Sequence, residues 1–453
     1  MIRPALAALM SAGFALSAAA AQDDVTAFRG VTVVPMDSER VLENHTVIVE
    51  GERISAVGPA GETDIPEGAT VIEGEGRWLM PGLAEMHGHV PGPDDPAYAE
   101  NVLFLYVSNG VTTVRNMAGH DSHPVLRDRV ESGEIIGPVL HIASPWLSPQ
   151  NANDPEQGRE TVRHYHEEGF DLLKMGNPPL GVYEAIAEEA HEVGIPFAGH
   201  IPHDVGLVGA LDARQISIDH FDRYVEFMAA EADTGMTDPG FFGSGWIHLA
   251  DRGRMPEAVE RTIEAGTWNV PTLSLVEHLA SDESAESMIE WPEMRYMPQN
   301  VRDGWVRSKN DFAARDDFQP EAAQELVEIR RELLMALHEA GALIALGSDA
   351  PQFFNVPGFS IHHEMAMMAA AGMTPYEVLE TGTRLPAEYF GTPEEFGTVE
   401  PGRRADLILL EADPLADLEN VKARAGVMAA GRWLSEDDIQ ARLDSIAAHV
   451  AGE

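Results

Sequence analysis

Two histidines separated by one residue, His87 and His89, are the first residues whose spacing suggests chemistry. Alternate side chains of a β-strand point the same way, so both imidazoles can approach one metal ion. Because 18 of the 453 residues are histidine, a structural or solvated pair is the default interpretation of this motif. The pair gains weight from its position, since it ends an apolar run introduced by LMPG at residues 79–82.

Lys174 lies within DLLKMG, among apolar residues that indicate a buried strand. Burying an ammonium group without a partner is costly, so this lysine needs an explanation. One explanation is a salt bridge, and the other is carbamylation by CO2, which creates a carboxylate able to bridge two cations. The chain has only three lysines, Lys174, Lys309 and Lys422, and this scarcity favours carbamylation.

Three further candidates end short apolar runs: His200 follows PFAG, His220 follows SID, and Asp349 follows LIALGS. Taken singly, each histidine is more typical of a hydrogen-bonded core or rim position. Asp349 alone is more typical of a turn or a helix cap. Taken with His87, His89 and Lys174, they place a potential metal ligand on five predicted strands.

The middle of the chain, residues 81–390, alternates short apolar runs with helical stretches, which is typical of βα units and a parallel sheet. Eight candidate strands occur, at GLAEM, VTTVRNM, PVLHIAS, DLLKMG, PFAGH, SIDH, NVPTLSL and LIALGSD. Eight such units close naturally into a TIM-type (β/α)8 barrel, whose catalytic groups lie at the carboxyl ends of the strands. The unusually long stretch 276–320 predicts a lid, and its contact with substrate stays open.

Short β-type runs separated by turn residues fill residues 25–80, and the same character returns in GTVEPGRRADLILLEADP and AGVMAAGRWL. We therefore expect both ends of the chain, residues 22–80 and 391–453, to pair into a small β-sandwich domain. The α/β barrel is then an insertion between the two halves of this domain.

Residues 1–21 place one arginine before an Ala-rich apolar run, a pattern typical of a cleaved signal peptide; an uncleaved anchor is the alternative. We expect a periplasmic or secreted protein without a later membrane span. The net charge of -45 argues against a nucleic-acid partner. The absence of cysteine excludes thiolate chemistry, and a homo-oligomer is left open.

Together, PGLAEMHGH, GVTTVRNM, DLLKMG, AGH, IDH, GSDAP and GTVEPGRRADLILLEADPL resemble the amidohydrolase superfamily, close to its imidazolonepropionase-like and prolidase-like branch. The resemblance covers nearly the whole mature chain. It implies a binuclear centre in which His87, His89 and Asp349 bind one metal, His200 and His220 bind the second, and carbamylated Lys174 bridges them. One departure is Glu85, where the family usually has aspartate.

Imidazole and carboxylate ligands suit zinc, and two such ions can hold a hydroxide between them. Asp349 is expected to take a proton from this nucleophile and deliver it to the leaving amine, and His220 is a second catalytic candidate. The predicted function is hydrolysis of a C–N amide bond in a small substrate such as a dipeptide or an N-acyl amino acid. A lactonase or phosphotriester hydrolase, or a non-catalytic metal-binding protein, are the alternatives.

Candidates for substrate binding are Arg115, His141, His203 and Tyr224, which fall near predicted strand ends. Such groups can orient a carboxylate or an oxyanion. Each has a structural alternative, which is an ion pair beneath the site for Arg115 and a surface loop for His203. The remaining candidates rank lower, as loop or helix residues: His120, His123, His362 and His363.

Overall fold

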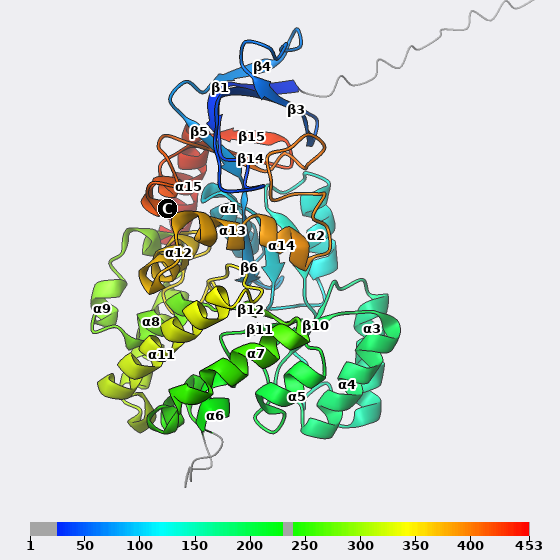
Figure 1. Cartoon of the computed structure of the whole chain (residues 1–453), viewed down its shortest axis with the longest axis vertical. Helices are drawn as coiled ribbons and strands as arrows, with labels where there is room; N and C mark the ends of the chain where they lie inside the picture. The colour runs from blue at the N-terminus through cyan, green and yellow to red at the C-terminus, as the bar shows by residue number, and fades with distance from the viewer. Residues whose placement is uncertain (1–24, 230–238, 453) are drawn as a thin grey trace, which may run out of the picture.

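The computed structural model describes residues 25–229 and 239–452. It divides the chain into a strand-rich part, built from both ends, and a larger part of parallel strands surrounded by helices (Figure 1). The mixed α/β class is as predicted. The predicted signal peptide, residues 1–21, lies outside the described residues.

Eight strands form one sheet in the order β15-β14-β13-β5-β1-β2-β3, with β4 also beside β1. They are β1 (Val25–Val33), β2 (Leu42–Glu50), β3 (Arg53–Pro59), β4 (Thr70–Glu73), β5 (Trp78–Pro81), β13 (Leu407–Leu410), β14 (Arg424–Ala429) and β15 (Arg432–Ser435). Antiparallel pairing of β5 with β13 joins the two ends of the chain. Within the predicted small β-sandwich domain, the hydrogen bonds define one branched sheet, because β4 and β5 pair with opposite ends of β1.

Strand β13 has the sequence LILL, and all four residues are buried because the strand lies between two hydrophobic cores. Leu407 and Leu409 belong to the core of the small sheet. Ile408 and Leu410 belong to the core that the helices and the parallel strands share. Side chains alternate between the two faces of a strand, so one apolar run serves both cores and fixes the sheet to the rest of the molecule.

Seven parallel strands lie at the centre of the larger part: β6 (Leu83–Gly88), β7 (Val111–Asn116), β8 (Val139–Ile142), β9 (Leu173–Met175), β10 (Phe197–Gly199), β11 (Ser217–Asp219) and β12 (Trp268–Val270). They form the sheets β6-β7-β8 and β9-β10-β11-β12, which a bridge between Ala143 and Leu172 connects. The backbone of residues 343–349 pairs with β12 on one side and with β6 on the other. The parallel segments therefore follow one another in a closed ring.

Two of the eight predicted strands differ from the structure. The run LIALGSD pairs with both neighbours only through isolated bridges and single hydrogen bonds, so it makes no regular strand. The run NVPTLSL is strand only up to Val270, and a helix begins at Leu273. Pro271 lies between them and has no N–H to donate, so the strand ladder cannot continue through it.

Helices connect the successive strands and surround the ring (Figure 1). They are α1 (Pro96–Ser108), α2 (His123–Glu131), α3 (Pro155–Glu167), α4 (Leu180–Val193), α5 (Gly206–Asp212), α6 (Tyr224–Ala229), α7 (Met255–Ala265), α8 (Leu273–Ala280), α9 (Ala285–Met288), α10 (Gln299–Ala313), α11 (Pro320–Glu339), α12 (Phe359–Ala371), α13 (Pro375–Thr381), α14 (Arg384–Tyr389) and α15 (Glu436–Ala451). Both α1 and α3 begin at a proline that follows an aspartate, and the aspartate side chain accepts hydrogen bonds from the first turn. No described helix combines the length and the apolar character needed to cross a bilayer.

The stretch 276–320, predicted as a lid, is largely helical. It contains the end of α8, then α9 and α10 and the short 3-10 helices η3 (Pro292–Tyr296) and η4 (Asp316–Phe318). Its three methionines and one of its two tryptophans are buried: Met288, Met294, Met297 and Trp305. These four side chains therefore pack in the interior of the protein. The other possibility for this stretch was contact with the substrate.

We predict that Leu409→Ala lowers the free energy of unfolding by about 2–5 kcal/mol, because it leaves a cavity in a core that cannot collapse freely. Leu409 is fully buried, whereas Leu180 is 41% exposed, so Leu180→Ala is the matched control. Urea unfolding of both variants checks the prediction. Equal losses of stability in the two variants would contradict the placement of β13 between two cores.

Candidate metal centre

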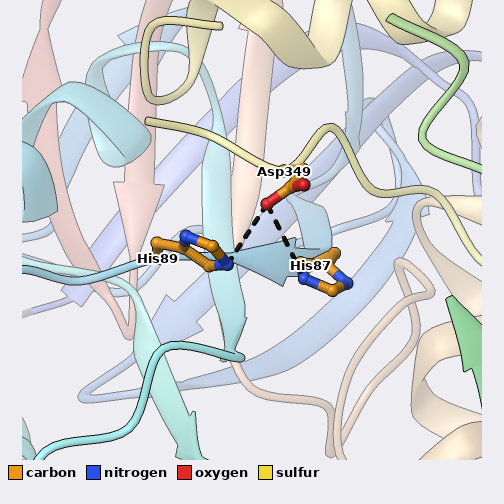
Figure 2. Close-up of side chains that lie close together, drawn as sticks. All are labelled: His87, His89 and Asp349. Carbon is orange, nitrogen blue, oxygen red and sulfur yellow. Dashed lines mark ion pairs between the residues drawn. The ribbon is translucent and has the colours of Figure 1, made fainter. Parts of the chain in front are cut away.

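Three potential ligands lie around one point at the carboxyl end of β6 (Figure 2). His87 is the penultimate residue of β6, His89 follows the strand, and Asp349 ends the neighbouring segment. Their ligand atoms lie within 4.8 Å of one another. Asp349 Oδ1 is 3.1 Å from His89 Nε2 and 3.7 Å from His87 Nε2.

The other three predicted ligands lie beside this group. Lys174 Nζ is 3.2 Å from His87 Nε2. The ring centroid of His220 is 4.4 Å from that of His87 and 5.0 Å from that of His200. The structure thus brings all six predicted ligands together at one end of the ring of parallel segments.

Gly199, which precedes His200 in the AGH motif, makes room for the lysine. Its backbone has a φ of 106°, a conformation that favours glycine. A Cβ atom there would lie 2.7 Å from Lys174 Cδ and 2.9 Å from the carbonyl oxygen of Met175. A larger residue would therefore displace the Lys174 side chain from the ligand group.

The second ring nitrogen of three ligand histidines faces an oxygen of a neighbouring side chain. The pairs are His87 Nδ1 with Asp219 Oδ2 at 3.0 Å, His200 Nδ1 with Asp222 Oδ2 at 2.9 Å, and His220 Nδ1 with Thr272 Oγ1 at 2.8 Å. An acceptor at Nδ1 holds the imidazole proton there and leaves Nε2 free to bind a metal. The contacts of His200 and His220 are hydrogen bonds, so they orient these two rings for metal binding. His87 Nδ1 and Asp219 Oδ2 lie close together without forming a hydrogen bond.

Thr272 can serve His220 because another residue caps the helix that follows it. Thr272 stands at the N-terminus of α8 with a φ of 47°, and its side chain makes no cap hydrogen bond. Glu364 accepts the bonds from Leu273 N at 2.8 Å and Ser274 N at 2.7 Å instead. Burial raises the pKa of Glu364 to about 7. The Thr272 hydroxyl is thereby left available to the imidazole.

Glu85, the residue where the resemblance led us to expect aspartate, is no ligand. Its carboxylate accepts hydrogen bonds from the backbone N–H groups of His87 at 3.0 Å and Ser348 at 2.8 Å. Burial raises its pKa to about 8. Glu85 therefore joins β6 to the segment that ends in Asp349. Its side chain, longer than that of aspartate, supports the ligands and does not bind the metal itself.

Burial also controls the ionisation of the ligands. It lowers the pKa of His89 to about 3, and it lowers those of His87 and His220 well below the ordinary value. These imidazoles are neutral at neutral pH, as metal binding requires. Burial lowers the pKa of Lys174 to about 8, so the neutral amine that reacts with CO2 forms more readily. No ion pair among the described residues includes Lys174, although the charges of Asp219 and Asp349 raise its pKa against the effect of burial, so both explanations of this lysine stay open.

The donor set fits a divalent cation. His89 Nε2 and Asp349 Oδ1 are buried and have no hydrogen-bond partner among the described residues. Such unpartnered atoms are costly, and a cation between them would satisfy both. Imidazole nitrogens and carboxylate oxygens are ligands for zinc, manganese, cobalt and iron.

Residues 78–434 match the sequence model of the amidohydrolase family. The chain belongs to this family. This finding confirms the resemblance that the motifs suggested.

The amidohydrolase is similar to curated and solved proteins along most of its length. It is 25% identical over 435 residues to an adenine deaminase of Rubrobacter xylanophilus, an alignment that covers 92% of this chain and 60% of that protein. It is 24% identical over 395 residues to an imidazolonepropionase of the same organism, with 81% and 84% covered. A solved Xaa-Pro dipeptidase with bound methionine has a TM-score of 0.65 and 20% identity, covering 91% of this chain and all of that one, which shows a shared fold.

The four predicted substrate residues do not join the amidohydrolase metal centre as a group. Arg115 is fully buried and donates to Ser217 Oγ at 2.8 Å, Tyr389 Oη at 2.7 Å and Asp219 Oδ1 at 2.8 Å. These contacts support the alternative role of an ion pair beneath the site. The guanidinium is therefore held by neighbouring side chains in the interior.

The other predicted substrate residues are also engaged elsewhere or exposed. The hydroxyl of Tyr224 lies 2.7 Å from Thr262 Oγ1 and 3.1 Å from Asn269 Oδ1, within the core. The ring of His141 stacks on Phe390 with centroids 3.5 Å apart. His203 is exposed on the loop after β10, which agrees with its alternative interpretation as a surface loop residue. The four lower-ranked histidines lie in loops or helices: His120, His123, His362 and His363.

Two aromatic rings that we did not predict flank the second half of the ligand group. Trp146, 44% exposed on the loop after β8, has its ring centroid 5.3 Å from that of His200. Phe242 stacks on His220 with centroids 5.3 Å apart. No spacing in the sequence marks either residue, because Trp146 lies on the loop after β8 and Phe242 in the 3-10 helix η1 (Phe241–Leu249), both outside the ligand motifs.

The sequence analysis also did not single out the residues that face the ligand histidines, and these residues differ in how visible they are in the sequence. Asp219 and Asp222 flank His220 in the run IDHFD, so their closeness to a ligand was visible in the sequence. Thr272 follows another strand and carries no local signal. Only the pairing of β11 with β12 places it beside His220.

We predict that Thr272→Val weakens zinc binding by about 10- to 100-fold, as expected when the partner of a ligand histidine is lost. Valine keeps the shape of threonine and removes the oxygen that faces His220 Nδ1. Thr272→Ser keeps this oxygen and should bind zinc nearly as the wild type does. Titration of metal-free protein with zinc checks both variants, and equal affinity in the valine variant would rule out the orienting role.

Proposed function

We propose that this amidohydrolase is a metal-dependent hydrolase that cleaves a C–N amide bond in a small-molecule substrate. The meeting of six potential ligands at one end of the parallel ring carries the proposal. The names of the similar adenine deaminase and Xaa-Pro dipeptidase, both of which refer to reactions at C–N bonds, support it.

We assign two divalent ions, with zinc as the proposed metal, to this centre. His87, His89 and Asp349 would hold the first ion, and His200 and His220 the second. Carbamylated Lys174 would lie between them. Such ions supply Lewis acidity and lower the pKa of water, so that water can attack a carbonyl at neutral pH.

Asp349 is the proposed proton carrier. Its Oδ2 accepts a hydrogen bond from Gln352 Nε2 at 2.8 Å, while its Oδ1 is free of protein donors among the described residues. Burial raises the pKa of Asp349 well above its ordinary value, and a cation bound beside it would lower this pKa again, so that the carboxylate is ionised and can accept a proton. It takes a proton from the attacking water and delivers it to the leaving nitrogen, so the carbonyl carbon gains hydroxyl and the nitrogen gains hydrogen. His220 is the second candidate for carrying this proton, and its Nδ1 lies 3.8 Å from Asp349 Oδ2.

Trp146 and Phe242 support an amide with an apolar or aromatic group near the carbonyl. Both rings lie within 5.3 Å of a ligand histidine and can pack against such a group. Arg115 is engaged beneath the site, so it does not select for a substrate carboxylate. N-acyl amino acids and dipeptides with aromatic side chains remain the proposed substrates.

The architecture and location that we propose follow the same assignment. Residues 81–390 would form the TIM-type barrel, with 22–80 and 391–453 as the second domain and 276–320 as an inserted cover. The closed order of the parallel segments supports the barrel. The composition of residues 1–21 supports export to the periplasm or the medium.

The direct test is a parallel assay of purified, zinc-loaded protein on aromatic N-acyl amino acids, dipeptides, lactones and phosphotriesters. We expect amide hydrolysis to have the highest kcat/KM, and exhaustive chelation to abolish it. Activity on lactones or phosphotriesters alone would replace the proposed reaction. Full amide hydrolysis after chelation would refute metal dependence.

We predict that Lys174→Ala loses binuclear metal binding, because the site then lacks its bridging carboxylate. Added short-chain carboxylic acids should partly restore activity to Lys174→Ala, whereas Lys174→Arg should stay inactive. Metal analysis and kcat measurements with and without acetate check this. Two bound metals and normal turnover in Lys174→Ala without added acid would show that the lysine has only a structural role.

A further inference from the structure

Arg330, in the middle of α11, is a buried cation whose hydrogen bonds go to backbone carbonyls. Its side chain is 2% exposed, and no ion pair among the described residues includes it. Burial lowers its pKa to about 10, so it stays charged at neutral pH. A buried charge that is not neutralised by a carboxylate is costly, and an apolar residue would avoid this cost.

The guanidinium group binds backbone carbonyls just past the ends of two neighbouring strands. It donates to the carbonyl oxygen of His220, to that of Pro271 at 2.7 Å and to that of Thr272 at 3.5 Å. The parallel ladder of β11 and β12 ends at Asp219 and Val270. Arg330 therefore joins the segments that follow β11 and β12, at the point where the two strands stop pairing.

Both residues beyond the ladder have a backbone that needs support. His220 has a φ of 63° and Thr272 a φ of 47°, left-handed conformations that side chains other than glycine adopt at a cost. Their side chains also meet, with His220 Nδ1 2.8 Å from Thr272 Oγ1. Any relaxation of either backbone would rotate the imidazole away from the other ligands.

A ring contact connects the same guanidinium to the face of the histidine. The Arg330 guanidinium lies 5.6 Å from the ring centroid of Phe242. Phe242 in turn stacks on the imidazole of His220 with centroids 5.3 Å apart. Arg330 thus acts on the backbone of His220 directly and on its ring through Phe242.

We propose that Arg330 is a positioning residue that holds His220 in its metal-binding orientation, by clamping the carbonyls of His220 and Pro271. This inference rests on the proposed function, since it assigns a task at the same metal centre. Arginine suits the task because its planar group donates several hydrogen bonds in fixed directions, which a lysine cannot reproduce.

The neighbouring Arg331 offers a matched control. It lies on the same helix and forms an ion pair with Glu277 at the surface, with 37% of its side chain exposed. Substitution of either arginine removes one guanidinium from α11. Only the loss of Arg330 removes the bonds to His220 and Pro271.

Metal-free full-length Arg330→Met and Arg331→Met are titrated with zinc by calorimetry. We expect Arg330→Met to lose about 10- to 100-fold in affinity at one of two zinc sites, the usual effect of losing support for a ligand histidine. Arg331→Met should keep both affinities. Arg330→Met that binds two zinc ions as tightly as the wild type would overturn the proposal.

A second readout does not depend on metal. Nitrogen NMR of the metal-free protein reports the tautomer of His220, which we expect with the proton on Nδ1 in the wild type and in a mixture in Arg330→Met. Arg330→Lys, which keeps the charge, should lie between the two and replaces Arg330→Met if that variant does not fold. An unchanged tautomer in both variants would overturn the proposal. A wild type that binds no zinc would refute the proposed function instead, and the NMR comparison would still test the clamp.

Discussion

The buried carboxylate of Asp219 links the metal ligands to the opposite half of the parallel ring. Its Oδ1 accepts a hydrogen bond from Arg115 at 2.8 Å, and its Oδ2 lies 3.0 Å from His87 Nδ1. Burial opposes ionisation of this group, but the charge of Arg115 and its hydrogen bond act against burial, and the pKa of Asp219 lies below the ordinary value. Without Asp219, Arg115 would be an unpaired buried cation and His87 would lose the carboxylate that lies beside its ring.

The backbone of two metal ligands at the carboxyl ends of the strands also has to be held in place by neighbouring residues. His220 and Asp349 both have a φ of 63°, so two ligands stand on left-handed backbone. Such conformations persist only where the surroundings determine them. Gln352 holds the carboxylate of Asp349, and Glu364 caps the helix that begins beside Thr272. The ligand geometry therefore depends on contacts made by residues that bind no metal themselves.

The sequence allowed prediction of six strands and of the residues that end them, because each signal is a short apolar run contiguous in the chain. It misled where a run continued past its strand, as in NVPTLSL, whose Pro271 stops the ladder and lets α8 begin at Leu273. The order of strands in the small domain could not be predicted, because runs and turns do not specify pairing partners. Hydrogen bonding of β4 and β5 to opposite ends of β1 produces one branched sheet.

The sequence by itself determined the identity of the six candidate ligands and the family. Residue types and local spacing are enough for these. Only the tertiary structure decided that Arg115 pairs with Asp219 beneath the site, 104 residues away, and that Arg330 reaches the carbonyl of His220, 110 residues away. Closure of the ring creates these contacts between distant segments, and a buried polar group takes whichever partner the packed neighbours supply, which no local pattern encodes.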